Sequence, residues 1–381
     1  MIPSNELPSS DSPHGSRNSA DCSIAGVPPG SPLASLNSNG TARADGRSPF
    51  QRVSALTPLI ACRRNPRMKF EPLDFSKIRT YPVAERANKV NVASFARPHE
   101  PGAAFREFLR RLPDFLAVQD FRKLVSAMAA AVRNQRPVVL MMGAHSIKVG
   151  LNPIFVDALR SGLVNAVAFH GAGAIHDFEL CYQGETSEDV QRGLNNGSFG
   201  MVDETGRRMN AALAAGVARG LGAGRSFGEA ARSSGYPNPA LSILATGAEL
   251  DIPVTVHVAI GTDIIHQHPT TDGAILGEAT YRDFKMFASV CACLEGGVLL
   301  NIGSAVIMPE VFLKALTIAR NLGHKVERFT TATFDMTRHY RPTENVQRRP
   351  TALGGAGFYF VGHHEIMVPL LFASVKEELS Q

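Results

Sequence analysis

Residues Pro137–Val190 read PVVLMMGAHSIKVGLNPIFVDALRSGLVNAVAFHGAGAIHDFELCYQGETSEDV, and this stretch decides the fold. An apolar run, Val138–Met142, ends in a turn that begins at Gly143, and a helical pattern follows. A second apolar run, Val164–Phe169, ends in His170 and a glycine-rich turn. Strand, turn, helix and strand in this order are typical of a parallel α/β sheet, which binds ligands outside the carboxyl ends of its strands. The stretch therefore predicts a cofactor or small-molecule site.

The same alternation of strands and helices continues through the chain from about Phe70. Helices of this length between strands indicate βαβ units with right-handed crossovers. The sequence therefore predicts a single α/β domain, Rossmann-like and doubly wound, with a mainly parallel sheet. We expect strands at 138–142, 164–169, 254–259, 298–302 and 326–331, a weaker one at 357–361, and helices at 103–116, 118–133, 153–161, 188–192, 203–219, 281–294 and 309–322.

The first 67 residues have a different composition from the rest. They are rich in Ser, Pro, Gly, Asn and Ala and show almost no periodicity. A segment of this kind cannot bury enough apolar surface to offset its loss of conformational entropy on ordering. We therefore expect a disordered tail at 1–67, or a misassigned start before Met68, followed by a folded domain at 68–381.

Composition limits the function classes. The chain has 381 residues, 44% of them hydrophobic, and a formal net charge of +5. No apolar run reaches the ~18 residues of a membrane-spanning helix, and no basic stripe interleaved with aromatics predicts nucleic-acid binding. Five irregularly spaced cysteines do not form the pattern of a disulfide framework, which favours a reducing, cytoplasmic location.

Three polar segments follow expected strands, at 143–150, 170–177 and 261–269. The first has small residues that allow backbone N–H groups to approach a phosphate, although an ordinary turn explains it equally well. The second places His176 beside Asp177, as in a general-base site, the alternative being a capping Asp177 and a surface His176. If the strands are neighbours, five histidines converge at one edge of the sheet: His145, His170, His176, His266 and His268.

Two further segments fit structural roles. In 185–190, Thr186 or Ser187 is expected to cap a helix whose first turn holds Glu188 and Asp189. The run at 363–365 is typical of a strand-to-helix junction.

Three of these blocks resemble deoxyhypusine synthase and its prokaryotic relatives: GAHSIKVGLNP at 143–153, HGAGAIHDFE at 170–179 and GETSEDV at 184–190. The resemblance runs from about residue 70 to the C-terminus. It implies a Rossmann-like enzyme that is typically a homotetramer with active sites at subunit interfaces. In that family NAD oxidises spermidine, and the aminobutyl group passes to an enzyme lysine and then to a lysine of the translation factor 5A precursor.

The resemblance also implies roles for individual residues. The family's catalytic Asp and His correspond to Asp263 and His268, and its polyamine-contacting acid corresponds to His176, which suits a cationic amine less well than a carboxylate. Late signatures of the family resemble Phe334-Asp335 and Arg341-Pro342. The positions implied to contact NAD are Ala144, His145, Ser146, Ile147, Lys148, Gly171, Gly173, Gly296 and Gly297.

The main departure is at the nucleophile. The family's glycine-rich segment ending in the catalytic lysine corresponds to 303–307, which places Ile307 where the lysine should be. Isoleucine cannot form an imine or accept an aminobutyl group. The family's tryptophan near that lysine is absent as well, since the chain contains none.

We therefore expect a divergent, NAD-dependent transferase acting on spermidine or a related amine, with no resident metal, and keep three alternatives open. One is deoxyhypusine synthase activity proper. Another is a non-catalytic partner of an active homologue. The last is a metal-dependent hydrolase that would use His145, His176, Asp177, His266 and His268.

Overall fold

The computed structural model describes residues 70–381, and its contacts divide the chain between Thr80 and Tyr81. Residues 70–80 are exposed and contain one short 3-10 turn, η1 (Phe75–Lys77), which begins after Asp74. The other described elements belong to the unit Tyr81–Gln381. The expected tail at 1–67 lies outside the described residues, and the boundary at residue 68 stays a prediction.

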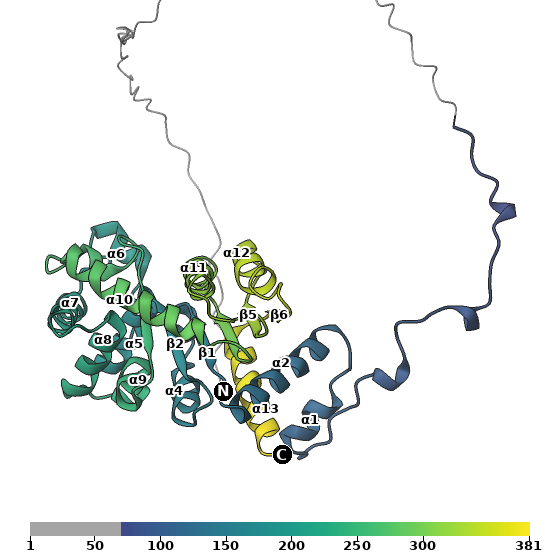
Figure 1. The fold of residues 1–381 in the computed structure, drawn as a ribbon, viewed down its shortest axis with the longest axis horizontal. Coiled ribbons are helices and arrows are strands. Elements are labelled where there is room, and N and C mark those ends of the chain that lie inside the picture. Colours follow the sequence, from purple (N-terminus) through teal and green to yellow (C-terminus); the bar gives the residue numbers. More distant parts are fainter. Residues whose placement is uncertain (1–69) are drawn as a thin grey trace, which may run out of the picture. The chain divides into compact units, whose positions relative to one another are not determined.

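The centre of the second unit is a six-stranded sheet in which every neighbouring pair of strands is parallel. The strand order is β3-β2-β1-β4-β5-β6, and Figure 1 shows the strands between the helices. The predicted α/β class with a parallel, doubly wound sheet is confirmed. The strands are β1 (Val138–Met142), β2 (Ala166–His170), β3 (Val254–His257), β4 (Val298–Ile302), β5 (Thr330–Asp335) and β6 (Ala356–Val361).

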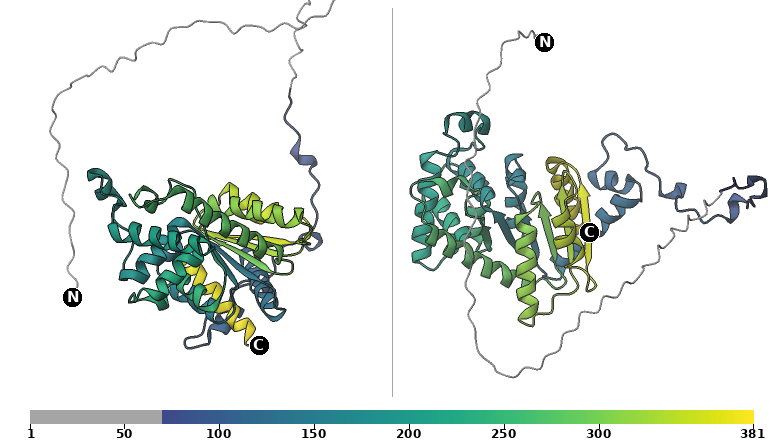
Figure 2. Two further views of the ribbon diagram at one scale, coloured as in Figure 1. Left: turned by 60° about the vertical axis from the view of Figure 1, so that its left-hand side comes forward. Right: turned by 90° about the horizontal axis from the view of Figure 1, so that it is seen from above.

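Successive side chains of a strand point to opposite faces of the sheet, so the apolar strands contribute side chains to two hydrophobic cores. In β1, Val138, Leu140 and Met142 belong to one core, whereas Val139 and Met141 belong to the other. Figure 2 shows helices on both sides of the sheet. The first face is covered by α2 (Leu116–Arg133), α4 (Asn152–Arg160) and α13 (His364–Leu379), and the second by α11 (Ile307–Asn321) and the C-terminal part of α10 (Gly273–Ala292).

A further group of helices packs beside β2 and β3, and two glycines allow its close contacts. A Cβ on Gly224 would lie 1.8 Å from the carbonyl oxygen of Val254, and one on Gly228 would lie 2.3 Å from that of Leu244. This group contains α5 (Gly171–Gln183), α7 (Asp203–Ala218), α8 (Ala223–Ser233) and α9 (Ile243–Leu250).

The remaining elements are short. They are η2 (Val83–Glu85), η3 (Val92–Ser94), α1 (Phe105–Arg111), α3 (His145–Lys148), α6 (Val190–Asn196), η4 (Pro239–Leu241), η5 (Ile264–Gln267), α12 (Tyr340–Pro342) and the π-helical η6 (Thr343–Arg348).

Several predicted boundaries were wrong. Strand β5 begins at Thr330 instead of residue 326, because the Glu295 carboxylate binds the backbone N–H groups of Glu327 (2.6 Å) and Arg328 (2.9 Å) and holds that segment outside the ladder. Helix α10 begins at Gly273, where Asp272 caps it, instead of at residue 281. We predicted no helix at the positions of α5, α8 or α9, whereas the strand-to-helix junction expected at 363–365 is where α13 begins.

Helix α6 is capped by a residue other than those we expected. The side chain of Asp189 accepts a hydrogen bond from the backbone N–H of Arg192 at 3.1 Å, so Asp189 is the N-cap.

Within residues 70–381, no helix combines the length and the apolar character needed to cross a membrane.

Candidate active site

The strand order fixes where the chain can place a ligand. From β1 the connections run outward through β2 and β3 on one side and through β4, β5 and β6 on the other. The crevice between the carboxyl ends of β1 and β4 is the switch point at which such sheets bind ligands. Gly143 follows β1 and Gly303 follows β4, and a Cβ on Gly143 would lie 2.3 Å from the carbonyl oxygen of Gly303. Only glycine permits this contact between the two turns.

Two histidines adjoin the switch point. The rings of His145, in α3, and His364, which begins α13, have centroids 5.6 Å apart. His364 is buried, and its Nε2 donates to the carbonyl oxygen of Phe334 at 3.1 Å. Burial lowers the pKa of His364, so its Nδ1 carries a lone pair, and this atom has no partner among residues 70–381. The switch point therefore has a buried acceptor that no described residue satisfies.

A cavity of about 460 Å³ adjoins this edge on the β2 and β3 side. We call it the acidic cavity because four carboxylates line it, against one lysine and no arginine. Glu188 is held in place by accepting a hydrogen bond from the backbone N–H of Gly200 at 2.8 Å. The titratable lining residues are Lys148, His176, Glu179, Glu185, Glu188 and Asp263, with Thr186, Ser187 and Thr262 among the others.

Two polar side chains on the wall of the acidic cavity, Thr186 and Glu179, fix the tautomer of His176. The hydroxyl of Thr186 donates to Oε2 of Glu179 at 2.5 Å, and it is also 2.6 Å from Nδ1 of His176. A hydroxyl has one proton to donate, so Nδ1 of His176 must donate to it. Burial and the nearby Lys148 lower the pKa of His176 to about 4, which leaves its Nε2 unprotonated at neutral pH.

Asp263 is a buried carboxylate that faces the acidic cavity, and two histidines flank it. Nε2 of His170 lies 3.9 Å from Oδ1, and Nε2 of His266 lies 3.7 Å from Oδ2. Nδ1 of His266 accepts the backbone N–H of Asp263 at 3.2 Å, so Nε2 carries the proton and faces the carboxylate. Burial raises the pKa of Asp263 to about 6, near the pH at which a general base works best.

Two other candidate residues lie outside the cluster that Asp263 forms with its two flanking histidines. His268 lies outside it: its Nε2 is 3.7 Å from Oδ1 of Asp203, and its Nδ1 accepts the backbone N–H of Thr270. The histidine beside Asp263 is thus His266. Asp177 is buried and accepts from the backbone N–H groups of Ile243 (2.8 Å) and Leu244 (3.1 Å), so it caps α9.

The predicted cofactor positions fall into different places. Ala144, His145 and Ser146 form the turn at the switch point, whereas Ile147 packs in the hydrophobic core and Lys148 lines the acidic cavity. Gly171 and Gly173 lie in the first turn of α5, and a Cβ on Gly171 would lie 2.1 Å from Oδ2 of Asp263.

Gly296 and Gly297 are a correction. They precede β4, and a Cβ on Gly297 would lie 2.4 Å from the carbonyl oxygen of Pro137, which precedes β1. Both glycines are therefore at the amino edge of the parallel sheet, the edge opposite the switch point, and they are not part of the candidate site.

The position expected for a nucleophilic lysine holds an apolar side chain. Ile307 begins α11 and packs against the core on the second face of the sheet. Lys314, two turns later, forms an ion pair with Glu310. Within residues 70–381, no group of three or more His, Cys, Asp or Glu side chains could hold a metal ion, so the ligand set of the hydrolase alternative is not assembled.

Sequence reasoning missed three contributors: Glu179, the bridging role of Thr186, and His364. Glu179 follows His176 by three residues, so predicting α5 as a helix would have placed both on one face. The link to Thr186 crosses from α5 to the following loop and had no signal in the sequence.

No protein-family model and no curated protein sequence matches this chain. Among solved structures, AgrE in complex with ornithine and NAD+ is 16% identical over 73% of this chain (TM-score 0.44). A putative LOR/SDH protein from Methanococcus maripaludis S2 is 12% identical over 79% of this chain and 76% of its own (TM-score 0.42). A putative deoxyhypusine synthase from Entamoeba histolytica is 9% identical over 73% and 95% (TM-score 0.42). This chain spans 34% of the AgrE chain, and these likenesses concern the fold alone.

Proposed function

We propose that this protein is an NAD-dependent enzyme that acts on a cationic amine. The observation that carries the proposal is the acidic cavity, which lies beside the switch point of a sheet with the strand order of dinucleotide-binding domains. The cavity supplies a site for a positively charged substrate, and the neighbouring turns supply a site for the cofactor.

The residues at the switch point fit a dinucleotide in part. The turns at Gly143 and Gly303 pack closely against each other at this crevice, and Nδ1 of His364 offers a buried acceptor for a hydroxyl or amide of the cofactor. Two features differ from the usual fingerprint: α3 has a single turn, and β2 ends in His170 where an acid usually binds the ribose. We assign cofactor contacts to 143–146, Ser304 and His364.

The acidic cavity suits an ammonium group by charge and size. Glu185 and Glu188 come from the loop that follows α5, and Glu179 comes from α5 itself. In a partly enclosed site, opposite charges attract more strongly than in bulk water. A volume of about 460 Å³ accommodates a small aliphatic amine.

His176 and Asp263 have different roles toward the amine. His176, neutral at pH 7 with an unprotonated Nε2, accepts a hydrogen bond from the amine and orients it. Asp263, whose pKa burial raises to about 6, accepts the proton that the amine nitrogen loses. NAD, when bound, would accept the hydride from the adjacent carbon, so that the amine is oxidised to an imine.

In its most specific form the proposal names spermidine as the amine. Because Ile307 cannot hold an aminobutyl group, that group would pass directly to an acceptor amine, either a small molecule or a lysine of the translation factor 5A precursor. A cytoplasmic homotetramer is part of this form of the proposal.

The test uses the purified full-length protein with NAD. NAD binding is measured by calorimetry, and NADH formation is followed by absorbance with putrescine, spermidine and, as a neutral control, an alcohol of equal length. We expect NAD binding and turnover of an amine but not of the alcohol. Absence of NAD binding would refute the proposal; NAD binding without turnover of any amine would favour the non-catalytic partner.

A further inference from the structure

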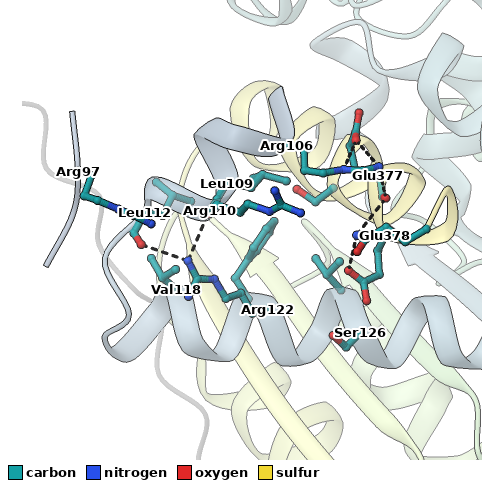
Figure 3. A pocket seen from close by; sticks show the side chains of 14 residues that line it. Arg97, Arg106, Leu109, Arg110, Leu112, Val118, Arg122, Ser126, Glu377 and Glu378 are labelled. Atoms are coloured by element: carbon teal, nitrogen blue, oxygen red, sulfur yellow. Dashed lines mark hydrogen bonds and ion pairs between the residues drawn. The ribbon is translucent and has the colours of Figure 1, made fainter. Parts of the chain in front are cut away.

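A second cavity, of about 510 Å³, lies between α1, α2 and the C-terminal end of α13 (Figure 3). It shares no lining residue with the acidic cavity, and four arginines line it, so we call it the arginine cavity. The lining residues are Arg97, Arg106, Leu109, Arg110, Leu112, Val118, Phe121, Arg122, Val125, Ser126, Ser374, Glu377, Glu378 and Gln381.

One wall of the arginine cavity is apolar and packs against the hydrophobic core. Phe121 and Val125 of α2 are buried and belong to the core that covers the first face of the sheet. Leu109 of α1 and Val118 of α2 extend this wall. The wall is therefore anchored to the domain and offers a fixed surface to a hydrocarbon or aromatic group.

Two of the four arginines hold the cavity together. Arg106 forms an ion pair with Glu377 at 2.9 Å and also donates to the backbone carbonyl of Glu377 at 3.0 Å, which ties α1 to α13. Arg122 donates to the carbonyl oxygens of Leu109 and Leu112 and so fixes the turn between α1 and α2. The guanidinium groups of Arg106 and Arg122 are therefore already bound by other residues of the protein.

The other two arginines have unused guanidinium groups. The side chains of Arg97 and Arg110 form no hydrogen bond and no ion pair with any residue from 70 to 381. In Figure 3, Arg110 reaches from α1 into the space between α1 and α13. A guanidinium beside an apolar wall matches a carboxylate whose organic body lies on that wall, because its parallel N–H groups bind both oxygens.

We propose that the arginine cavity binds a small organic monocarboxylate with an apolar body. The carboxylate binds Arg110, and the body lies on Leu109, Val118 and Phe121. The ligand carries one negative charge, because Glu378 also lines the cavity with no arginine or lysine paired to its carboxylate among the described residues, and a second charge on the ligand would be repelled.

Octanoate is a suitable probe, titrated into the full-length protein in a calorimeter. Octanol tests the need for charge, acetate tests the need for an apolar body, and octyl phosphate tests the preference for a single charge. We expect saturable binding of octanoate, and binding of the other three at least about tenfold weaker. Absence of saturable octanoate binding overturns the proposal, equal binding of octanol overturns the role of Arg110, and tighter binding of octyl phosphate overturns the choice of a carboxylate.

Variants locate the site. Arg110→Met keeps an apolar stem but removes the charge, and we expect it to weaken octanoate binding about tenfold. Arg192→Met, at an exposed arginine of α6 outside the cavity, is the matched control and should leave binding unchanged. Val118→Gln makes the wall polar without touching an arginine and should also weaken binding. Circular dichroism checks that each variant folds, and equal octanoate affinity in Arg110→Met and wild type contradicts the assignment.

Discussion

Two buried aspartates in different regions have pKa values that burial raises, yet their surroundings differ. Asp283, in α10, is 4% exposed and has a pKa of about 7; Asp263, at the carboxyl edge, is 6% exposed and has a pKa of about 6. The carboxylate of Asp283 accepts the backbone N–H groups of Gly224 (2.8 Å) and Val256 (2.7 Å), which joins α8, β3 and α10. Asp263 instead faces a cavity and two histidines.

The difference separates a structural carboxylate from a candidate catalytic one. A raised pKa by itself marks burial, which both regions share. Backbone donors show that Asp283 completes the hydrogen bonding of a helix start and an edge strand. Asp263 belongs to the wall of a cavity, lies beside two histidines, and has no hydrogen-bond partner for its carboxylate among the described residues, so we infer that it is the one that acts on a ligand. The comparison predicts opposite consequences for activity and stability when each residue is replaced.

The largest effect is expected at Asp263. Asp263→Asn removes the proposed proton acceptor, and loss of general-base catalysis should lower turnover of the amine about 10²–10⁴-fold. The free energy of unfolding should not fall, because the variant no longer buries a carboxylate that burial disfavours. Turnover is measured by NADH formation and stability by urea unfolding at pH 8. Unchanged turnover with a folded protein would remove Asp263 from the mechanism.

Asp283 should respond in the opposite way. Asp283→Ala leaves the buried N–H groups of Gly224 and Val256 without an acceptor, and we expect a loss of about 3 kcal/mol in the free energy of unfolding. Turnover per folded molecule should not change, because Asp283 lies outside the candidate site. A large loss of turnover in a variant that remains folded would show that hydrogen bonds from backbone donors do not distinguish a structural carboxylate from a catalytic one.

The pH dependence of stability sharpens the same comparison. The pKa of Asp283 is raised in the folded protein, so its contribution to stability is complete below about pH 4 and is lost as the pH rises through about 7. In that window its share of the slope approaches about 1.4 kcal/mol per pH unit. Asp283→Asn keeps an acceptor but does not titrate. The free energy of unfolding of this variant, measured between about pH 4 and 7, should fall less steeply than that of wild type by this amount.

Part of the fold could be read from the sequence because buried parallel strands are continuous apolar runs. Strands β1 and β4 have the predicted bounds, and both are buried throughout. Helix α8 was missed because it contains Gly224 and Gly228, residues that normally weaken helices. Here they are required by close contacts with Val254 and Leu244, which are visible only in the folded chain.

The arrangement of the candidate site could be anticipated only in part. Strand ends place 143–146 and Asp263 at the carboxyl edge of the sheet, and the same reasoning would place Gly296, which precedes a strand, at the opposite edge. The partner of Asp263 depended on a detail that spacing does not reveal. The 3-10 turn η5 returns the ring of His266 to Asp263, whereas His268 follows the turn and packs against Gly206 of α7.

The smallest effect tests the hydroxyl bridge on the wall of the acidic cavity. Thr186→Val keeps the shape of the side chain but removes the bridge between Glu179 and His176, so the imidazole no longer has an imposed tautomer. The lost hydrogen bond is worth about 1.5 kcal/mol, which corresponds to about a tenfold lower turnover of the amine. Thr186→Ser retains a hydroxyl and should restore most of the rate. A purely structural role of Thr186 would reduce the amount of folded protein but not the rate per folded molecule. Equal rates in Thr186→Val and Thr186→Ser would therefore show that the tautomer of His176 does not matter. The chemistry of the cavity would then rest on Asp263 alone.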